Sequence, residues 1–163
     1  MKILVLSDSH SSLYLMRQAV SRIRPNAIVH LGDYYDDGQV LAEENPNIAF
    51  YQVPGNCDRY RMSGFSPETL CFEVCEIRLF MTHGHLHQVK AGLYHLLADA
   101  REKQAQAVLY GHTHLPDCRN VDGLWILNPG SCGNGGTVGI IEAEAGQILS
   151  CRVIKQEDLK AEL

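Results

Sequence analysis

Residues 1–10 have the sequence MKILVLSDSH, in which an apolar run gives way abruptly to polar side chains. The run from Lys2 to Ser7 is rich in Ile, Leu and Val, a pattern typical of a strand that is buried on both faces of a sheet. The polar cluster Asp8-Ser9-His10 follows at the point where that strand ends. This unit, a buried strand with reactive side chains at its carboxyl end, recurs along the chain and decides the predicted fold.

Strand-like and helix-like segments alternate through the first third of the chain. The apolar positions of residues 11–24 recur at helical spacing, and Pro25-Asn26 ends that predicted helix. Buried strands are predicted at 27–31 and 48–53, with a short helix over 38–44 between them. This βαβαβ order predicts parallel strands joined by right-handed crossovers.

The rest of the chain is predicted to be richer in strands. Consecutive strands without a helix between them are expected at 69–77 and 78–82, followed by a helix over 90–103. The remaining predicted strands are 108–110, 124–127, 137–141 and 148–154. We therefore expect an α/β protein in which two packed sheets carry helices on their outer faces, formed as a single domain over residues 1–163.

Composition excludes several classes of protein. The chain has 163 residues, 45% of them hydrophobic, which is too apolar for a disordered segment, and its net charge of −5 disfavours binding of nucleic acids or anionic membranes through bulk positive charge. No run approaches the roughly 18 apolar residues of a membrane helix, and the first apolar run is too short for a signal peptide, so we expect a cytoplasmic protein. The six cysteines form no Cys-x-x-Cys pair, which predicts reduced thiols.

Five polar clusters share one position, because each directly follows a predicted strand. They are Asp8-Ser9-His10, Gly32-Asp33, Gly55-Asn56-Cys57-Asp58, Thr82-His83-Gly84-His85 and Gly111-His112-Thr113-His114. Ligands bind outside the carboxyl ends of the strands in open α/β sheets, so we expect these clusters to converge. A sixth polar turn, residues 128–131, follows the strand at 124–127 and is expected to shape the same site.

One or two side chains from each cluster make a set of seven candidate metal ligands: Asp8, His10, Asp33, Asn56, His83, His112 and His114. These imidazole, carboxylate and amide donors suit manganese, iron, zinc or nickel better than a soft metal, and they are richer in nitrogen than a magnesium site prefers. Seven ligands are too many for one catalytic zinc ion and suit two ions that share a carboxylate. Asp33, the one ligand of its cluster, is the predicted bridge.

The ordered motifs Asp-x-His, Gly-Asp, Gly-Asn-x-Asp, His-Gly-His and Gly-His-x-His resemble those of the calcineurin-like metallophosphoesterases. The chain is most similar to the small YfcE-type phosphodiesterases, which also carry Gly-Asn-Cys-Asp and Asn-Pro-Gly-Ser, and the resemblance runs from Lys2 to about Ile154. It implies a four-layer α/β/β/α sandwich. It also implies one metal ion on Asp8, His10, Asp33 and His114 and a second on Asp33, Asn56, His83 and His112.

The resemblance further implies that the protein hydrolyses phosphodiesters with a metal-bridging hydroxide, without a serine or cysteine nucleophile. Two divalent ions are expected, with manganese preferred and zinc, iron or nickel as alternatives. Asp33, Asn56 and His85 are the expected catalytic residues, and His85 is assigned to contact with the phosphate or the leaving group. We expect a small phosphodiester or other phosphoester as substrate and no membrane or nucleic-acid partner, and we leave open an oligomer of identical chains.

One position departs from the wider superfamily. Many members have histidine where this chain has Cys57, and that histidine pairs with the following aspartate to help the leaving group depart. Asp58 is therefore expected to lack its usual partner, and the site is expected to favour good leaving groups such as those of aryl phosphodiesters. Arg59 and Arg61 are either phosphate-steering residues or solvated surface residues.

Structural interpretations compete with these assignments. Asp8 or Ser9 is a candidate cap for the following helix, His30 is expected to be a core residue, His87 a solvated loop residue, and residues 34–37 a solvated acidic loop. A phosphomonoesterase or nucleotidase would share every metal ligand. A non-catalytic metal-binding scaffold, like the retromer subunit vacuolar protein sorting 29, would share the fold but is expected to have lost ligands that this chain retains.

Overall fold

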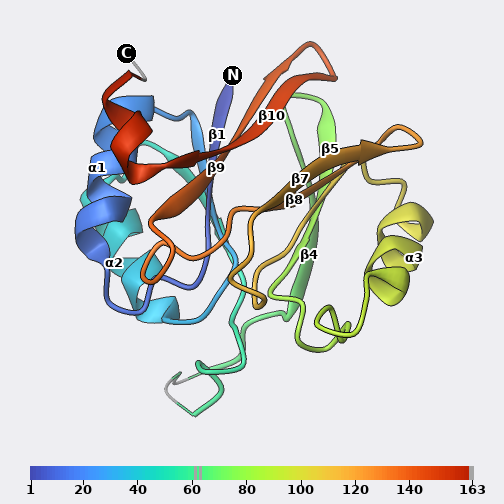
Figure 1. Cartoon of the computed structure of the whole chain (residues 1–163), viewed down its shortest axis with the longest axis horizontal. Coiled ribbons are helices and arrows are strands. Elements are labelled where there is room, and N and C mark those ends of the chain that lie inside the picture. The colour runs from blue at the N-terminus through green and yellow to red at the C-terminus, as the bar shows by residue number, and fades with distance from the viewer. Residues whose placement is uncertain (61, 63, 162–163) are drawn as a thin grey trace.

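The computed structural model describes residues 1–60, 62 and 64–161, which form two five-stranded sheets packed face to face (Figure 1). The first sheet has the order β10-β9-β1-β2-β3 and the second the order β4-β5-β6-β8-β7. The strands are β1 Lys2–Leu6, β2 Ala27–His30, β3 Ala49–Gln52, β4 Thr69–Val74, β5 Ile77–Thr82, β6 Ala107–Leu109, β7 Asp117–Val121, β8 Leu124–Asn128, β9 Thr137–Glu144 and β10 Gln147–Lys155.

Helices cover the outer faces of both sheets. They are α1 Leu13–Ile23, α2 Tyr35–Glu44, α3 Tyr94–Glu102 and the 3-10 helix η1 Gln156–Ala161. Helices α1 and α2 lie against the first sheet and α3 lies against the second, as Figure 1 shows. The predicted α/β/β/α sandwich is thus confirmed. No helix among the described residues is long and apolar enough to cross a membrane.

The alternation of side chains along β1 explains why this strand is apolar throughout. Ile3 and Val5 point into the layer between the sheets, whereas Leu4 and Leu6 point into the layer beneath α1. All four side chains are fully buried. A strand with two buried faces cannot alternate between apolar and polar residues, which is the physical basis of the pattern in the sequence.

Parallel pairing places the carboxyl ends of the central strands at one edge of each sheet. In the first sheet β1 pairs with β2 and β2 with β3, and in the second β5 pairs with β6 and β6 with β8, all in parallel. The outer edges of the sandwich are also in contact. The rings of Tyr51 on β3 and Phe72 on β4 stack at 4.0 Å, and the Sγ atoms of Cys118 on β7 and Cys151 on β10 lie 3.2 Å apart.

Three of the differences from the sequence prediction have a clear physical reason. Helix α2 begins at Tyr35 instead of residue 38, so residues 34–37 are not a solvated loop, and Asp37 is buried. Helix α3 begins at Tyr94 instead of residue 90, because Gly92 has a φ of +149°, which no helix allows. Strand β7 was not predicted, because an edge strand with the sequence DCRNV has no buried face to mark it.

The environments of His30 and His87 test the structural roles expected for these two histidines. His30 is completely buried at the end of β2, as predicted. His87 is also buried, which corrects the expectation of a solvated residue, and its Nε2 atom lies 2.9 Å from Asp99 Oδ2 on α3. This contact fastens the segment after β5 to the helix that follows it.

Burial of His30 predicts a dependence of stability on pH. Burial lowers the pKa of this imidazole from 6.5 to about 4, so His30 is neutral in the folded protein at a pH where the unfolded chain takes up a proton. Its contribution to stability is present above pH 6.5 and is lost as the pH falls toward 4, by up to about 1.4 kcal/mol per pH unit.

We predict that His30→Gln flattens the decline in unfolding free energy between pH 6.5 and 4.5, measured by urea denaturation of metal-free protein. His95→Gln is the control, because His95 is exposed on α3 and should leave the slope unchanged. Equal slopes for wild type and His30→Gln would contradict the assignment.

Candidate metal centre

The polar clusters that follow the strands meet at one edge of the sandwich. The backbone N–H of His112 donates to Asp8 Oδ2 at 3.2 Å, although 104 residues separate them. His83 Nε2 lies 3.1 Å from Asn56 Oδ1 and 3.5 Å from Asp33 Oδ1. Loops after β1, β2, β3, β5 and β6 therefore contribute to one site, in the place that the parallel topology predicts.

Four of the seven candidate ligands form a tight group. The potential ligand atoms of Asp8, His10, Asp33 and His114 all lie within 4.8 Å of one another. The buried atoms Asp8 Oδ1 and His10 Nε2 have no hydrogen-bond partner, and His114 Nε2 lies 3.0 Å from Asp8 Oδ1 without hydrogen-bond alignment. An unpaired buried polar atom costs about 1–3 kcal/mol. A divalent cation would satisfy all of these atoms, so the residues fit a metal ion.

Asp8 is oriented by its second carboxylate oxygen. The Ser7 hydroxyl donates to Oδ2 at 2.6 Å, and together with the N–H of His112 it leaves Oδ1 to face the other ligands. Gly111 allows this approach, because a Cβ atom at that position would collide with the Ser7 hydroxyl. The sequence singled out the glycine and the aspartate but held no signal for Ser7.

The other three candidate ligands, Asn56, His83 and His112, lie outside that group, and His83 also faces Asp33. His83 Nδ1 is 2.8 Å from the carbonyl oxygen of Leu31; since a carbonyl only accepts, Nδ1 carries the proton and Nε2 is directed toward Asn56 and Asp33. The His112 ring is 5.1 Å from that of His83. Burial, with the nearby charges of His83 and Lys90, lowers the pKa of His112 to about 4, so its lone pair is available for a metal at neutral pH.

Asp33 lies between the two sets of ligands. It belongs to the tight group and its Oδ1 atom also faces His83, where it accepts a hydrogen bond from the backbone N–H of Cys57 at 2.9 Å. Burial by itself would raise the pKa of Asp33, but His83 and the Cys57 N–H outweigh burial and lower it. A Cβ atom at Gly55 would collide with Asp33, so this position also requires glycine.

The backbone is strained where the ligands lie. Five of the seven candidate ligands have positive φ angles, which side-chain-bearing residues rarely adopt: Asp8, His10, Asp33, His112 and His114. Each such residue costs on the order of 1–3 kcal/mol, and such residues cluster at functional sites because the surrounding fold holds them there. The strained backbone at this edge is therefore evidence, independent of the sequence motifs, that the site is functional.

Two carboxylates that are not ligands hold the loops in place. Asp58 Oδ1 accepts the backbone N–H groups of Tyr34 and Tyr35, and its Oδ2 accepts that of Gly55. Asp58 has no histidine partner at position 57, and its carboxylate oxygens accept these backbone N–H groups instead. It connects the Asp33 loop to the loop after β3 and caps the start of α2, which explains why that helix begins early.

Asp37 has a similar role in the first loop. Its Oδ2 atom accepts the Ser9 hydroxyl at 2.7 Å and the Ser11 N–H at 2.9 Å. Neither Asp8 nor Ser9 caps α1, because the N-cap residue Ser12 makes no side-chain capping bond and the Asp8 carboxylate is directed into the site.

The turn after β8 closes the other side, as predicted. Asn128 Nδ2 donates to the Gly111 carbonyl oxygen and to the Thr113 hydroxyl, at 3.1 and 2.9 Å. The Ser131 hydroxyl donates to the carbonyl oxygen of Asp8 at 2.8 Å. Both residues contact the ligand-bearing loops and neither is itself a ligand.

His85 lies beside the second set of ligands. Its ring is 5.5 Å from that of His83 and 6.1 Å from that of His112, and its Nε2 atom is 3.8 Å from Glu68 Oε2. Burial lowers the pKa of His85, so the ring is neutral at pH 7. Arg59 is exposed, whereas Arg61 lies outside the described residues.

Comparisons with known proteins agree with this geometry. The family model of the calcineurin-like phosphoesterase superfamily domain matches residues 1–146. Phosphodiesterase YfcE of Escherichia coli is 28% identical over 176 residues and 92% of each chain is covered. A structure of a predicted phosphoesterase from Streptococcus pneumoniae has a TM-score of 0.78 and 26% identity over 96% of this chain and 90% of that chain. Vps29 of Entamoeba histolytica complexed with Zn²⁺ has a TM-score of 0.70 at 20% identity, covering 96% of this chain and 99% of its own, a likeness of fold.

The hydrogen bonds of Asp58 lead to a prediction for a residue that is not a ligand. Asp58→Ala removes the acceptor of three backbone N–H groups, so we expect the unfolding free energy to fall by about 3 kcal/mol and manganese affinity to fall at least roughly tenfold. Urea denaturation and calorimetric titration measure the two effects. Asp36→Ala is the matched control, since Asp36 is exposed in the first turn of α2. Equal losses in both variants would show that Asp58 has no special role.

Proposed function

We propose, since the chain belongs to the calcineurin-like phosphoesterase superfamily, that it is a dinuclear metal-dependent phosphodiesterase. One observation carries the proposal: the buried, unpaired atoms Asp8 Oδ1 and His10 Nε2 lie in a compact four-ligand group, and Asp33 connects that group to His83. Family membership supports a hydrolase that uses divalent metals, and a relative that is named a phosphodiesterase favours diesters.

The ligands divide into two sets around Asp33. In the proposal Asp8, His10, Asp33 and His114 hold one ion, and Asp33, Asn56, His83 and His112 hold the other. Ions bound there would supply a water of low pKa and positive charge for the phosphoryl oxygens. Manganese is our proposed ion, because the donors combine imidazole, carboxylate and amide without a thiolate.

The chain's own residues provide positioning. Ser7 and Leu31 fix the orientation of Asp8 and His83 before any substrate arrives, so little reorganisation is needed on binding. His85 faces the same space from the side of the second set and is our candidate for contact with the phosphate or the leaving group. We also propose that residues 1–163 act as one domain, because strands from both halves of the chain build the layer between the sheets. A cytoplasmic location remains a prediction from the sequence.

A non-catalytic scaffold is the second candidate. The likeness to Vps29 supports it, because that protein shares the fold over nearly its whole length. The ligand set favours the enzyme, because a scaffold of this type is expected to have lost metal ligands, whereas this chain retains all seven candidates.

Hydrolysis by metal-stripped protein tests the proposal. We expect bis(4-nitrophenyl) phosphate to be hydrolysed after addition of manganese, and Asp33→Asn to lose more than about 100-fold of that activity together with the manganese-induced rise in Tm. Zinc, nickel and magnesium are tested in parallel, with His95→Gln as the variant that should change nothing. Preference for 4-nitrophenyl phosphate would make the protein a phosphomonoesterase, and two bound ions without turnover would favour the scaffold.

Cys57 leads to a prediction about the leaving group. An imidazole at this position could protonate a departing alcohol, which the cysteine does less well, and general acid catalysis is worth about 10²–10⁴-fold. We expect Cys57→His to raise turnover of alkyl phosphodiesters by about tenfold, the low end because Asp58 is already occupied, while aryl diesters change little. Cys57→Ser adds no imidazole and serves as the control. Unchanged turnover of the alkyl diesters in Cys57→His would refute the explanation.

A further inference from the structure

A groove of about 480 Å³ adjoins the candidate metal centre. One side is formed by Val89, Lys90 and Leu93, in the segment between β5 and α3, and the other by the chain that leads from the His112–His114 loop into β7. Thr113, which lies between two of the proposed metal ligands, is part of the lining. The groove is thus continuous with the loop that carries His112 and His114.

The apolar part of the groove is open to solvent. Val89 is buried beneath it, and Leu93, Leu115 and Pro116 line it. Leu115 exposes 71% of its surface, although it directly follows a proposed ligand. An exposed leucine beside a polar centre gains free energy when an apolar group covers it.

The charges of the groove leave one cation without a partner. Asp117 is engaged by Arg119, whose Nε atom lies 3.3 Å away, and by the Tyr110 hydroxyl at 3.1 Å. Lys90 makes no ion pair with any of the described residues. Lys90 is exposed and lines the groove together with Thr113 of the ligand-bearing loop, so the groove holds an ammonium group with no ion-pair partner among the described residues.

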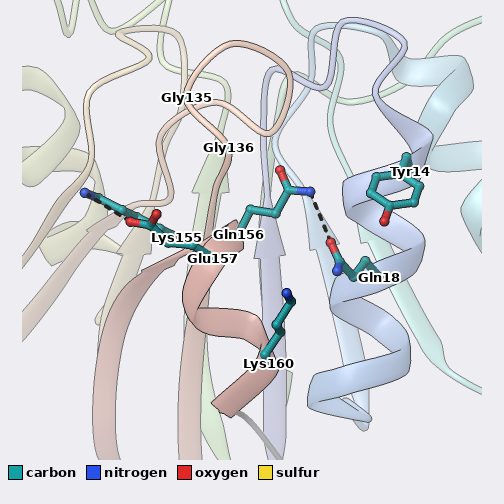
Figure 2. A pocket seen from close by; sticks show the side chains of 8 residues that line it. All are labelled: Tyr14, Gln18, Gly135, Gly136, Lys155, Gln156, Glu157 and Lys160. Carbon is teal, nitrogen blue, oxygen red and sulfur yellow. Dashed lines mark hydrogen bonds and ion pairs between the residues drawn. The ribbon is translucent and has the colours of Figure 1, made fainter.

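A second hollow on the molecule serves for comparison. It has a volume of about 570 Å³ and lies between α1 and η1 (Figure 2). Its side chains pair with one another: Gln156 donates to Gln18, and Lys155 lies 3.8 Å from Glu157. It shares no lining residue with the candidate metal centre. Its residues therefore make good controls.

We infer that the groove beside Lys90 binds an apolar or aromatic ester group of the substrate while Lys90 contacts an anionic oxygen. The inference rests on the proposed function and narrows it, because the substrate class becomes organic phosphodiesters with at least one large apolar ester group. Lys90 and Leu115 are then specificity-determining residues. The occupant is a substrate group because the groove is lined by Thr113, between two of the proposed metal ligands, and holds both apolar side chains and the Lys90 ammonium group.

Two matched pairs of variants test the inference with bis(4-nitrophenyl) phosphate and manganese-loaded protein. We expect Leu115→Ser and Lys90→Met each to raise KM by about five- to tenfold, with a smaller effect on kcat. Leu149→Ser removes another exposed leucine, 59% exposed on β10, and Lys160→Met removes a lysine from the hollow in Figure 2. Both controls should leave KM unchanged, and metal stoichiometry is measured in all four.

Inhibition by inorganic phosphate separates the two contacts, because phosphate has the anionic oxygens but no ester group. The inhibition constant should rise in Lys90→Met and stay at the wild-type value in Leu115→Ser. The inference is overturned if Leu115→Ser has the same KM as Leu149→Ser. It is also overturned if Leu115→Ser weakens the binding of inorganic phosphate as strongly as it weakens the binding of the diester. If the wild type does not hydrolyse the diester, the proposed function fails and the groove is tested separately. The same variants are then compared by calorimetric titration with the diester, and equal affinities in all of them would overturn the inference about the groove as well.

Discussion

Burial of the two carboxylates Asp8 and Asp33 is the constraint on which the rest of the structure depends. They are 0% and 3% exposed, and the buried oxygen Asp8 Oδ1 has no hydrogen-bond donor. A buried anion is tolerated only when a positive charge or several donors compensate it. The structure supplies N–H and O–H donors to one oxygen of Asp8 and leaves the other for an ion. The free-energy cost of these buried carboxylates at the edge of the sheets is thus offset by the stability of the apolar layers of the sandwich.

That edge is held by backbone hydrogen bonds between loops that are distant in sequence. Asp8 N–H donates to the carbonyl oxygen of Gly32, Gly111 N–H to that of His83, and Cys132 N–H to that of Ser7. The carboxylates of Asp37 and Asp58 accept further hydrogen bonds from these loops. These hydrogen bonds between loops hold the left-handed backbone at the ligands.

The fold and the side chains of the candidate site contribute differently to function. A sandwich shared with a scaffold such as Vps29 carries no information about catalysis by itself. In the proposed function the chemistry resides in imidazoles that burial keeps neutral, such as His112, and in a histidine whose tautomer is set by the Leu31 carbonyl oxygen. Substrate preference would come from neighbouring surfaces, such as the groove beside Lys90, which can vary without disturbing the ligands.

The sequence by itself was sufficient for the two packed sheets, the parallel pairing of the first strands and the convergence of the clusters, because a strand with two apolar faces such as β1 must be central and its carboxyl end must meet those of its parallel neighbours. It was insufficient wherever a polar group is satisfied by a distant partner. Asp58 caps a helix 23 residues earlier in the chain, and His87 is buried against Asp99, neither of which leaves a local pattern. Residue periodicity reports which side chains are apolar, whereas only the tertiary structure decides which donor meets which acceptor, because those pairings depend on loops brought together after the sheets have formed.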